Sequence, residues 1–262
     1  MSTTPPPHGL QPLAALGSGP LYREAKRELQ RLVEGGRYGP GDTLPSEPVI
    51  ARALGVSIGT LRKAVDELVH ENVLVRRQGK GTFVALHNDA RFMFQFFHVE
   101  PREEFPVADE LRAREYPQVE CVGFLRARAD DTEASALRIK PGDAVVRIDN
   151  RLSLSGRAVV HDHIAIAAQT FKGLTEKRFL ERPSTIYTLY QTDYGITVLR
   201  ARERARATAA GRETSRILGV AMGAPVLEVH RVALTFGDKP VEYRISTVNT
   251  ASHDYVSLLA KR

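Results

Sequence analysis

The feature that most constrains the fold is a run of three short helices and a hairpin within residues 20–85. Apolar residues recur at helical spacing over 21–34, and two further helices are expected over 47–54 and 58–71. Gly55 separates the last two helices, which is typical of a helix-turn-helix motif. In such a motif the later helix enters the major groove of DNA, so the pattern predicts that 58–71 is a recognition helix.

Local signals support these boundaries and add a hairpin after the third helix. Ser46 and Ser57 are well placed as N-caps, because a serine side chain can accept a hydrogen bond from the first helical turn. Two strand-like runs, 73–77 and 82–84, flank the turn Gln78-Gly79-Lys80-Gly81. A basic, glycine-containing tip directly after a recognition helix is typical of a wing, since glycine lets the backbone come close to phosphates.

Length and composition indicate a two-domain protein that is free of membranes. The 262 residues allow two hydrophobic cores, and the formal net charge of +6 is compatible with a polyanionic partner. No stretch approaches the roughly 20 apolar residues of a membrane-spanning helix. The N-terminus lacks the basic start of a signal peptide, so we expect a cytoplasmic protein with no membrane partner.

Four segments are expected along the chain. Residues 1–18, with Pro5-Pro6-Pro7, are expected to form a disordered tail. Residues 19–86 hold the winged helix-turn-helix, and 87–91 form a polar linker. Residues 92–258 form a second domain.

The second domain alternates short strands with short helices. Strands are expected at about 119–128, 144–154, 157–166, 196–207, 225–236 and 240–249. Helices are expected at about 108–115, 132–138, 170–179, 184–193 and 209–218. Strands that are joined by hairpins and flanked by helices predict an α+β domain with an antiparallel sheet.

The N-terminal motifs closely resemble, in order and spacing, the DNA-binding domain of the GntR family of bacterial regulators. The matching pieces are Pro20-Leu21-Tyr22, Pro40-Gly41, Leu44-Pro45-Ser46-Glu47, Gly55-Val56-Ser57, Thr60-Leu61-Arg62 and Arg77-Gln78-Gly79-Lys80-Gly81-Thr82-Phe83. The resemblance implies a sequence-specific transcriptional regulator that binds double-stranded operator DNA. Because one such domain makes few contacts, we expect a homodimer that reads a palindrome.

The resemblance also implies which residues contact DNA, namely those at the starts of the second and third helices and in the wing. The candidates are Ser46, Ser57, Thr60, Arg62, Lys63, Arg77, Gln78, Gly79 and Lys80. Arg62 is the best candidate for a base contact, because a guanidinium pairs bidentately with guanine. The chain departs from the family at Pro48 and Ile58, where many members carry arginine, and both changes remove a usual DNA contact.

The C-terminal layout resembles the UTRA effector domain of the HutC branch, which has a chorismate-lyase-like fold. The matching pieces are 137–143, 147–154, 184–187, 194–195, 218–220, 223–225 and 239–243. The resemblance implies a sensor domain and a repressor that leaves its operator when a small anionic metabolite binds.

The resemblance places the effector pocket on polar groups of these segments. The candidates are Arg147, Arg151, Ser153, Asp162, Thr185, Tyr187, Glu242 and Arg244. Arg147, Arg151 and Ser153 alternate along one expected strand and so share a face, where arginine can hold a carboxylate or phosphate. Many sugar-phosphate-sensing members carry a second arginine where this chain has Ser153, and they tend to carry an aromatic residue near Val248. Both features are missing here, so the resemblance does not favour an amino-sugar phosphate, and a smaller carboxylate or phosphonate-type ligand is equally open.

Three further features have competing interpretations. His161-Asp162-His163 places two imidazoles on one side of a strand, but no third ligand is evident, so we expect no metal. The run Arg200–Arg206 is predicted to be a strand with one solvated face rather than a nucleic-acid patch. Cys121, the single cysteine, is expected to be a buried structural thiol rather than a nucleophile.

Other classes of protein fit less well. The lyase-like fold raises the possibility of an enzyme, but no acid–base or nucleophile constellation stands out, and fold does not transfer function. A GntR regulator with an aminotransferase-like domain would need a longer chain and a cofactor lysine. An all-helical metal-binding effector domain does not fit the β-rich pattern. We therefore expect a regulator without catalytic activity and without a cofactor.

Overall fold

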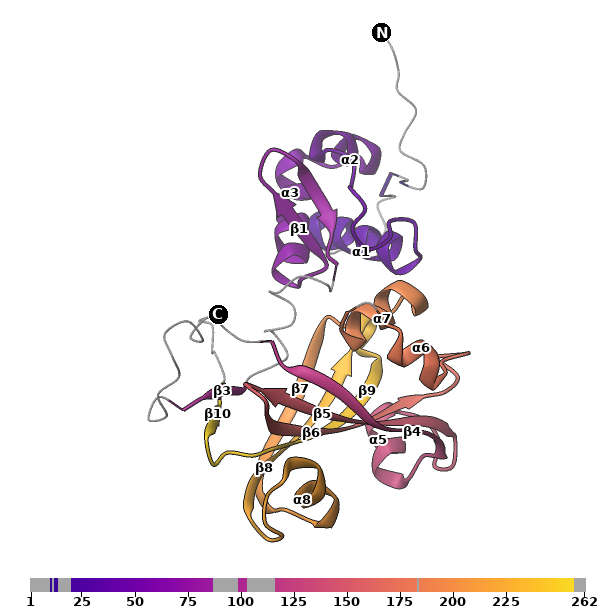
Figure 1. Cartoon of the computed structure of the whole chain (residues 1–262). Coiled ribbons are helices and arrows are strands. Elements are labelled where there is room, and N and C mark those ends of the chain that lie inside the picture. Colours follow the sequence, from indigo (N-terminus) through magenta and orange to yellow (C-terminus); the bar gives the residue numbers. More distant parts are fainter. Residues whose placement is uncertain are drawn as a thin grey trace. The chain divides into compact units, whose positions relative to one another are not determined.

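The computed structural model describes residues 10, 12–13, 20–86, 99–102, 116–182 and 184–256. By its internal contacts the chain divides into two compact units. The first contains residues 1–87 and 187–199, and the second contains residues 88–186 and 200–262. Figure 1 shows the helices and strands of each unit, coloured along the sequence.

The first unit contains the three helices that the sequence predicts. They are α1 (Leu21–Glu34), α2 (Glu47–Leu54) and α3 (Ile58–His70). Helix α3 packs against both α1 and α2, and the apolar faces of the three helices bury side chains such as Leu29 and Leu61. The helical spacing of these apolar residues is what lets each helix turn one face inward.

The predicted wing follows α3. Strands β1 (Leu74–Arg77) and β2 (Gly81–Val84) pair antiparallel, with Arg77 opposite Gly81. Gly79 lies in the turn between them at φ +69°, a left-handed conformation that a residue with a Cβ adopts only at a cost. The winged helix-turn-helix is thus confirmed, and its tip depends on a glycine.

A helix from the middle of the C-terminal sequence also belongs to the first unit. Helix α7 (Ile186–Tyr194) and the residues that follow it, up to Leu199, contact this unit from residue 187 onward. The Gln191 side chain is buried, and its Nε2 donates to the Ala85 carbonyl oxygen at 3.0 Å. Ala85 directly follows the wing strand β2, so α7 is hydrogen-bonded to the base of the wing.

Little of the expected tail and linker is described. Leu10 is buried, and the backbone N–H of Leu13 donates to the carbonyl oxygen of Leu54 at 3.0 Å. Most of the segment 1–18, the expected linker 87–91 and the expected helix 108–115 lie outside the described residues.

The second unit is built on a six-stranded antiparallel sheet, as the α+β prediction requires. Its strands, in spatial order, are β4 (Gln118–Arg128), β5 (Ala144–Leu154), β6 (Arg157–Ala167), β9 (Pro240–Val248), β8 (Pro225–Leu234) and β7 (Arg200–Ala209). Strands β4 and β7 are therefore the two edges. A separate pair, β3 (Val99–Pro101) with β10 (His253–Tyr255), was not predicted from the sequence.

Short helices accompany the sheet. They are α5 (Asp131–Leu137), α6 (Glu176–Leu180), α8 (Arg212–Leu218) and the 3₁₀ turn η2 (Phe236–Asp238). The helix expected at about 170–179 is wrong in its first half: residues 168–173 form turns, and α6 begins only after Thr175, whose side chain caps it. Within the described part of the chain, no helix has the length and apolarity needed to cross a membrane.

Helix α5 distinguishes the two faces of the sheet. Its Ala134 and Leu137 pack with Val145, Ala165 and Tyr243 in one hydrophobic cluster. We call the side of the sheet that carries this cluster the α5 face. Because side chains alternate along each strand, the pairing register assigns every sheet residue either to the α5 face or to the opposite face.

Candidate DNA-binding surface and effector site

The start of the recognition helix is held in place by a capping serine. Ser57 Oγ accepts a hydrogen bond from the Thr60 backbone N–H at 3.0 Å and lies 2.8 Å from Thr60 Oγ1. Ser46 occupies the matching position before α2, but its side chain accepts no capping hydrogen bond. The Ser46 hydroxyl is exposed, so it can donate to a phosphate.

Arg62 stands on the outer side of α3 and is braced by α2. Its Nε donates to Glu47 Oε2 at 3.2 Å, while the side chain stays 62% exposed. Glu47 also binds Arg76 of β1, at 2.9 Å between Nη2 and Oε1, and Arg76 pairs with Asp66 as well. One carboxylate of α2 thus connects the predicted base-reading arginine to the wing.

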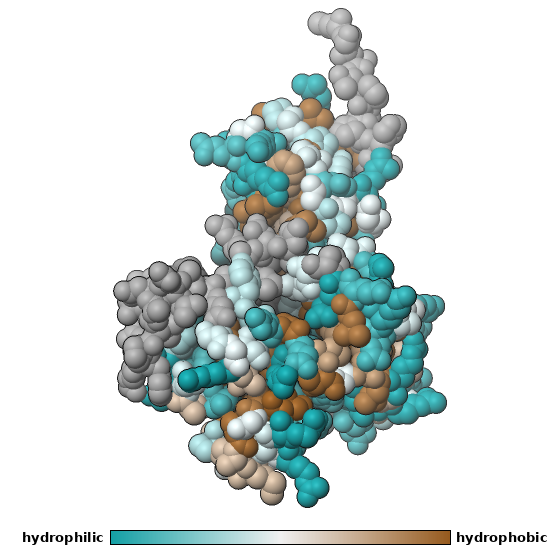
Figure 2. Space-filling view, viewed as in Figure 1, coloured by the Kyte–Doolittle hydropathy of each residue, from teal (hydrophilic) through white to brown (hydrophobic). Residues whose placement is uncertain are grey.

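The tip of the wing is polar and open to solvent. Arg77, Gln78, Gly79 and Lys80 are all exposed, and the Arg77 guanidinium lies 4.8 Å from the centre of the Phe83 ring. Figure 2 shows hydrophilic residues gathered over this part of the first unit. Exposed basic, amide and backbone groups of this kind can contact DNA phosphates.

Lys63 differs from the other DNA-binding candidates. Its ammonium lies 4.0 Å from the centre of the Tyr22 ring of α1, a cation–π contact within the first unit.

The two positions where the chain departs from the family are also at the surface. Pro48 is exposed near the start of α2, and Ile58 is 44% exposed at the first position of α3.

The effector-site candidates fall into separate groups. The register that pairs Arg151 with His161 and Asn150 with Asp162 puts Arg147 and Arg151 on the α5 face, and Asp162 on the opposite face. Glu242 and Arg244 also lie on the opposite face, because Ser246, two residues further on, is paired with Asp162. The structure therefore does not bring the arginines of β5 together with the acidic candidates.

On the α5 face, both predicted arginines have acidic partners. Arg147 Nε donates to Glu133 Oε1 at 2.7 Å, and Glu133 is buried. Arg151 pairs with Glu120 of the neighbouring edge strand. Neither guanidinium is thus left as an unpaired cation that could bind an anion without breaking an ion pair.

The two histidines of the possible metal motif share a carboxylate instead. Asp149 Oδ1 lies 3.3 Å from His161 Nε2 and 2.8 Å from His163 Nδ1. Burial alone would raise the pKa of Asp149, but hydrogen bonds from both imidazoles hold it well below its usual range. The hydrogen bond to Asp149 raises the pKa of His163. Among the described residues, no group of three His, Cys, Asp or Glu side chains is arranged to hold a metal ion.

On the opposite face, four candidate and neighbouring side chains form what we call the Asp162 cluster: Asp162, Glu242, Arg244 and Ser246. Arg244 Nη1 donates to Asp162 Oδ2 at 2.8 Å, and its Nε donates to Glu242 Oε1 at 3.0 Å. Ser246 Oγ donates to Asp162 Oδ1 at 2.5 Å. Both carboxyl groups are buried, so one guanidinium serves two carboxylates inside the protein.

Asn150 lies directly across the strand pair from Asp162 and was not predicted from the sequence. It is 3% exposed, and its Oδ1 has no hydrogen-bond partner among the described residues. A buried acceptor without a donor is costly, so this oxygen is suited to accept a hydrogen bond from a ligand.

A second ion pair adjoins the cluster. Arg231, which is paired across the sheet with Arg244, donates from Nε to Glu203 Oε1 at 2.5 Å. Tyr255 donates to Glu203 Oε2 at 2.5 Å. Glu203, Arg231 and Tyr255 were not predicted from the sequence. The alternation along β7 was nevertheless a signal that Glu203 lies on the opposite face of the sheet from Arg202 and Arg204.

The remaining effector candidates lie elsewhere. Ser153 continues the alternation past Arg151 and pairs with Gln118 of β4. Thr185 directly precedes α7, and Tyr187 lies in α7 with its ring centre 5.8 Å from that of Tyr190. Cys121 is half-buried with a raised pKa, caused mainly by burial, which suits an unreactive thiol.

Comparison with known proteins matches both units. Residues 21–84 match the gntR family of bacterial regulatory proteins, and residues 113–254 match the UTRA domain. The Escherichia coli repressor of the mannosyl-D-glycerate transport/metabolism system, MngR, is 26% identical over 94% of this chain and 98% of its own. The histidine utilization repressor of Pseudomonas putida is 30% identical over 54% of each chain.

Solved structures agree with this assignment. The ligand-binding domain of a GntR-family regulator from Bordetella bronchiseptica is 30% identical, with a TM-score of 0.57 over 63% of this chain and 98% of that one. PhnF from Mycobacterium smegmatis shares the fold over 91% of this chain and all of its own, at 21% identity and a TM-score of 0.53. The chain belongs to the GntR family of bacterial transcriptional regulators, in the HutC branch that carries a UTRA domain.

Proposed function

We propose that this regulator is a cytoplasmic repressor that binds a palindromic operator as a homodimer and leaves it when a small anionic metabolite binds the UTRA domain. The observation that carries the proposal is the exposed surface formed by Ser57, Thr60 and Arg62 with the wing tip. That surface offers hydroxyl groups and the backbone N–H groups of the glycine-containing turn, both of which can bind phosphates. It also offers Arg62, which Glu47 holds in place and which can pair with a base.

The Asp162 cluster is the effector site that we propose. Its two carboxylates and the unpartnered Asn150 oxygen are hydrogen-bond acceptors, which suit hydroxyl or amino groups of a metabolite. Arg244 supplies the positive charge but already pairs with Asp162 and Glu242, so, as at Arg147 and Arg151, an anionic group that binds there must displace an ion pair. The ligand that fits combines an anionic group with hydrogen-bond donors.

Helix α7 supports coupling between effector and DNA. Its sequence lies within the UTRA match, yet residues 187–199 belong to the first unit, where Gln191 binds Ala85 at the base of the wing. Because α7 belongs to the UTRA sequence and is hydrogen-bonded to the residue that follows β2, it is the segment through which we propose that effector binding reaches the wing. Such coupling is typically worth about 1–3 kcal/mol.

Fluorescence anisotropy with the DNA upstream of the gene tests the DNA half of the proposal. We expect the wild type to shift to the bound state at moderate salt, and R62A to bind about 5- to 150-fold more weakly, which corresponds to the loss of one bidentate base contact. The matched control is R27A, because Arg27 is an exposed arginine of α1 that pairs with Glu24 on the same helix. If R62A and R27A lose the same amount of operator affinity, the loss comes from net charge alone and Arg62 does not contact a base.

A thermal-shift screen of organic acids, sugar phosphates and phosphonates tests the effector half. A true effector raises the melting temperature and also lowers operator affinity, since it binds the two states unequally. A compound that stabilises the protein while leaving operator binding unchanged contradicts the release mechanism. An operator that no compound of these classes displaces would do the same.

A further inference from the structure

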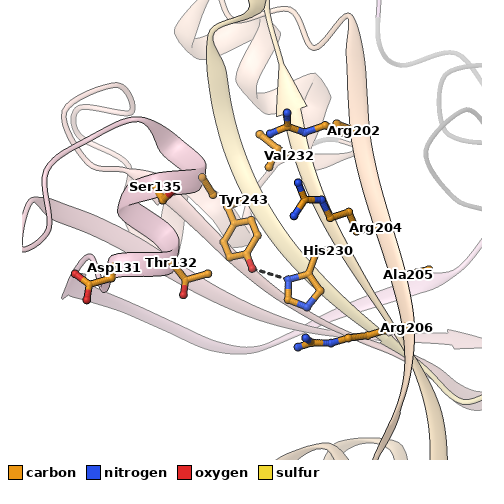
Figure 3. A pocket seen from close by; sticks show the side chains of 11 residues that line it. Asp131, Thr132, Ser135, Arg202, Arg204, Ala205, Arg206, His230, Val232 and Tyr243 are labelled. Carbon is orange, nitrogen blue, oxygen red and sulfur yellow. Dashed lines mark hydrogen bonds between the residues drawn. The ribbon is translucent and has the colours of Figure 1, made fainter.

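A groove of about 680 Å³ opens on the α5 face of the second unit, within the size range of about 300–1,000 Å³ of small-molecule sites. Helix α5 and strand β7 flank it, and β8 and β9 contribute its floor. Figure 3 shows the side chains of Arg202, Arg204 and Arg206 reaching from β7 toward His230 and Tyr243. The groove lies on the opposite side of the sheet from the Asp162 cluster.

The arginines share the groove because they alternate along an edge strand. Arg202, Arg204 and Arg206 pair with Val232, His230 and Glu228 of β8 and lie on one face. The backbone positions of successive members are about 6.4–6.8 Å apart along the strand. The alternation predicted from the sequence is therefore confirmed, but this strand face lines a hollow instead of a flat solvated surface.

Two of the three charges are uncompensated. Arg206 Nη2 lies 2.6 Å from Glu228 Oε1. Arg202 and Arg204 make no hydrogen bond or ion pair with any residue that the structure describes. Asp131, on α5, is the acidic residue of the lining, so the three arginines leave the lining with a net positive charge.

The floor of the groove is held rigidly by a chain of hydrogen bonds. His230 Nε2 lies 2.6 Å from Glu228 Oε1, and His230 Nδ1 lies 2.6 Å from the Tyr243 hydroxyl. On the facing wall, Thr132 and Ser135 are one helical turn apart and therefore present hydroxyls on the same side of α5. The groove thus combines fixed polar groups with two unpaired guanidinium groups.

We propose that this groove binds a small dianion, either a phosphate monoester or a dicarboxylate, through Arg202 and Arg204. A planar guanidinium forms paired hydrogen bonds with carboxylate or phosphate oxygens, so two guanidinium groups on one strand face can bind the two carboxylates of one ligand or share one phosphate. The hydroxyls of Thr132 and Ser135 complete the set of donors. Binding in the groove does not depend on whether its occupancy releases DNA.

Isothermal titration of the full chain with inorganic phosphate and with succinate, at low ionic strength, tests the proposal. We expect at least one probe to bind, and the R202Q/R204Q double variant to bind it at least tenfold more weakly. The matched control is R157Q/R216Q, which removes the same charge from two exposed arginines outside the groove that have no ion pair among the described residues. That control should bind within twofold of the wild type, and the tighter probe identifies the ligand class.

Each remaining outcome is decisive. No binding of either probe, or equal weakening in both double variants, overturns the proposal. If R202Q/R204Q instead lowers operator affinity and its salt dependence while the probes bind normally, the arginines contact DNA phosphates and the proposal is wrong. Operator binding by the wild type is measured in parallel, so a failure of the proposed repressor function remains distinguishable from a failure of the groove.

Discussion

Replacing Arg244 with methionine should strongly destabilise the second unit. The Arg244 side chain is 11% exposed and donates to Asp162 and to Glu242, whose side chains are 3% and 0% exposed. Methionine fills much of the same volume but carries no charge. The substitution therefore leaves two carboxylates close together inside the protein without their shared cation.

The expected loss can be estimated from the burial of the pair. Removing one partner of a buried ion pair costs about 3–5 kcal/mol, because the remaining charge stays desolvated. Ser246 still donates to Asp162, which offsets a small part of that cost. For a domain of this size, about 2–4 °C of melting temperature is lost per kcal/mol, so R244M should melt roughly 6–20 °C lower.

Thermal unfolding followed by circular dichroism at pH 7 measures this loss. R157M is the matched control, because Arg157 is an exposed arginine at the start of β6, and it should melt within about 1 °C of the wild type. The triple variant D162N/E242Q/R244M removes the buried charges altogether and should recover most of the stability. The reasoning is refuted if R244M melts with the control, or if the triple variant is no more stable than R244M.

Three further predictions concern other parts of the molecule. H163Q removes the ion pair with Asp149 and should lower the free energy of unfolding by roughly 1 kcal/mol at pH 5–6. The loss stays this small because His163 is partly exposed and solvent screens the pair. The substitution should cost less at pH 9, because a raised histidine pKa stabilises the fold below about 6.5 and the gain disappears as the pH rises through that raised pKa. Urea denaturation at both pH values measures the difference, and equal losses would contradict it. Q191L removes the donor to Ala85 and should reduce effector-driven operator release several-fold in anisotropy titrations, whereas T192A on the exposed side of α7 should not. G79A should weaken operator binding a few-fold because alanine adopts φ +69° at about 1–2 kcal/mol, and unchanged affinity would show that the wing tip does not need that backbone.

The helices of the first unit could be predicted because their signals are local. The N-cap Ser57, the amphipathic spacing of α1 and the break at Gly55 each act within one or two turns. The wing was predictable for the same reason, since a short turn with glycine joins two strands that are neighbours in sequence. Six strands of the sheet were also expected close to their observed bounds.

The assignment of α7 could not be predicted in this way. The sequence indicates a helix near 184–193, and the structure has one at Ile186–Tyr194. The unit that this helix packs against depends on long-range contacts such as that of Gln191 with Ala85, which are 106 residues apart. Helical periodicity says which face is apolar but carries no information about its partner.

The division of the effector-site candidates between two faces of the sheet could not be predicted, because it depends on register. Alternation along β5 correctly put Arg147 and Arg151 on one face. Whether Asp162 of β6 shares that face depends on pairing, and a shift of one residue would reverse the answer. In the observed register Asp162 lies opposite Asn150 and not opposite Arg151. The arginines of β5 and the acidic candidates therefore lie on different faces of the sheet.

The same alternation explains how strand β7 serves both faces of the sheet. Arg202 and Arg204 face the groove, while Glu203 between them faces the other way and binds Arg231 beside the Asp162 cluster. An edge strand can carry so many arginines on one face because that face is not covered by a second sheet and each guanidinium reaches water or a ligand. The alternation of side chains along β7 could therefore be predicted from the sequence. The groove that Arg202 and Arg204 line depends instead on where α5 packs against the sheet. That placement follows from the packing of Leu137 and Ala134 in one cluster with residues of four strands, β5, β6, β8 and β9, and no local signal encodes it.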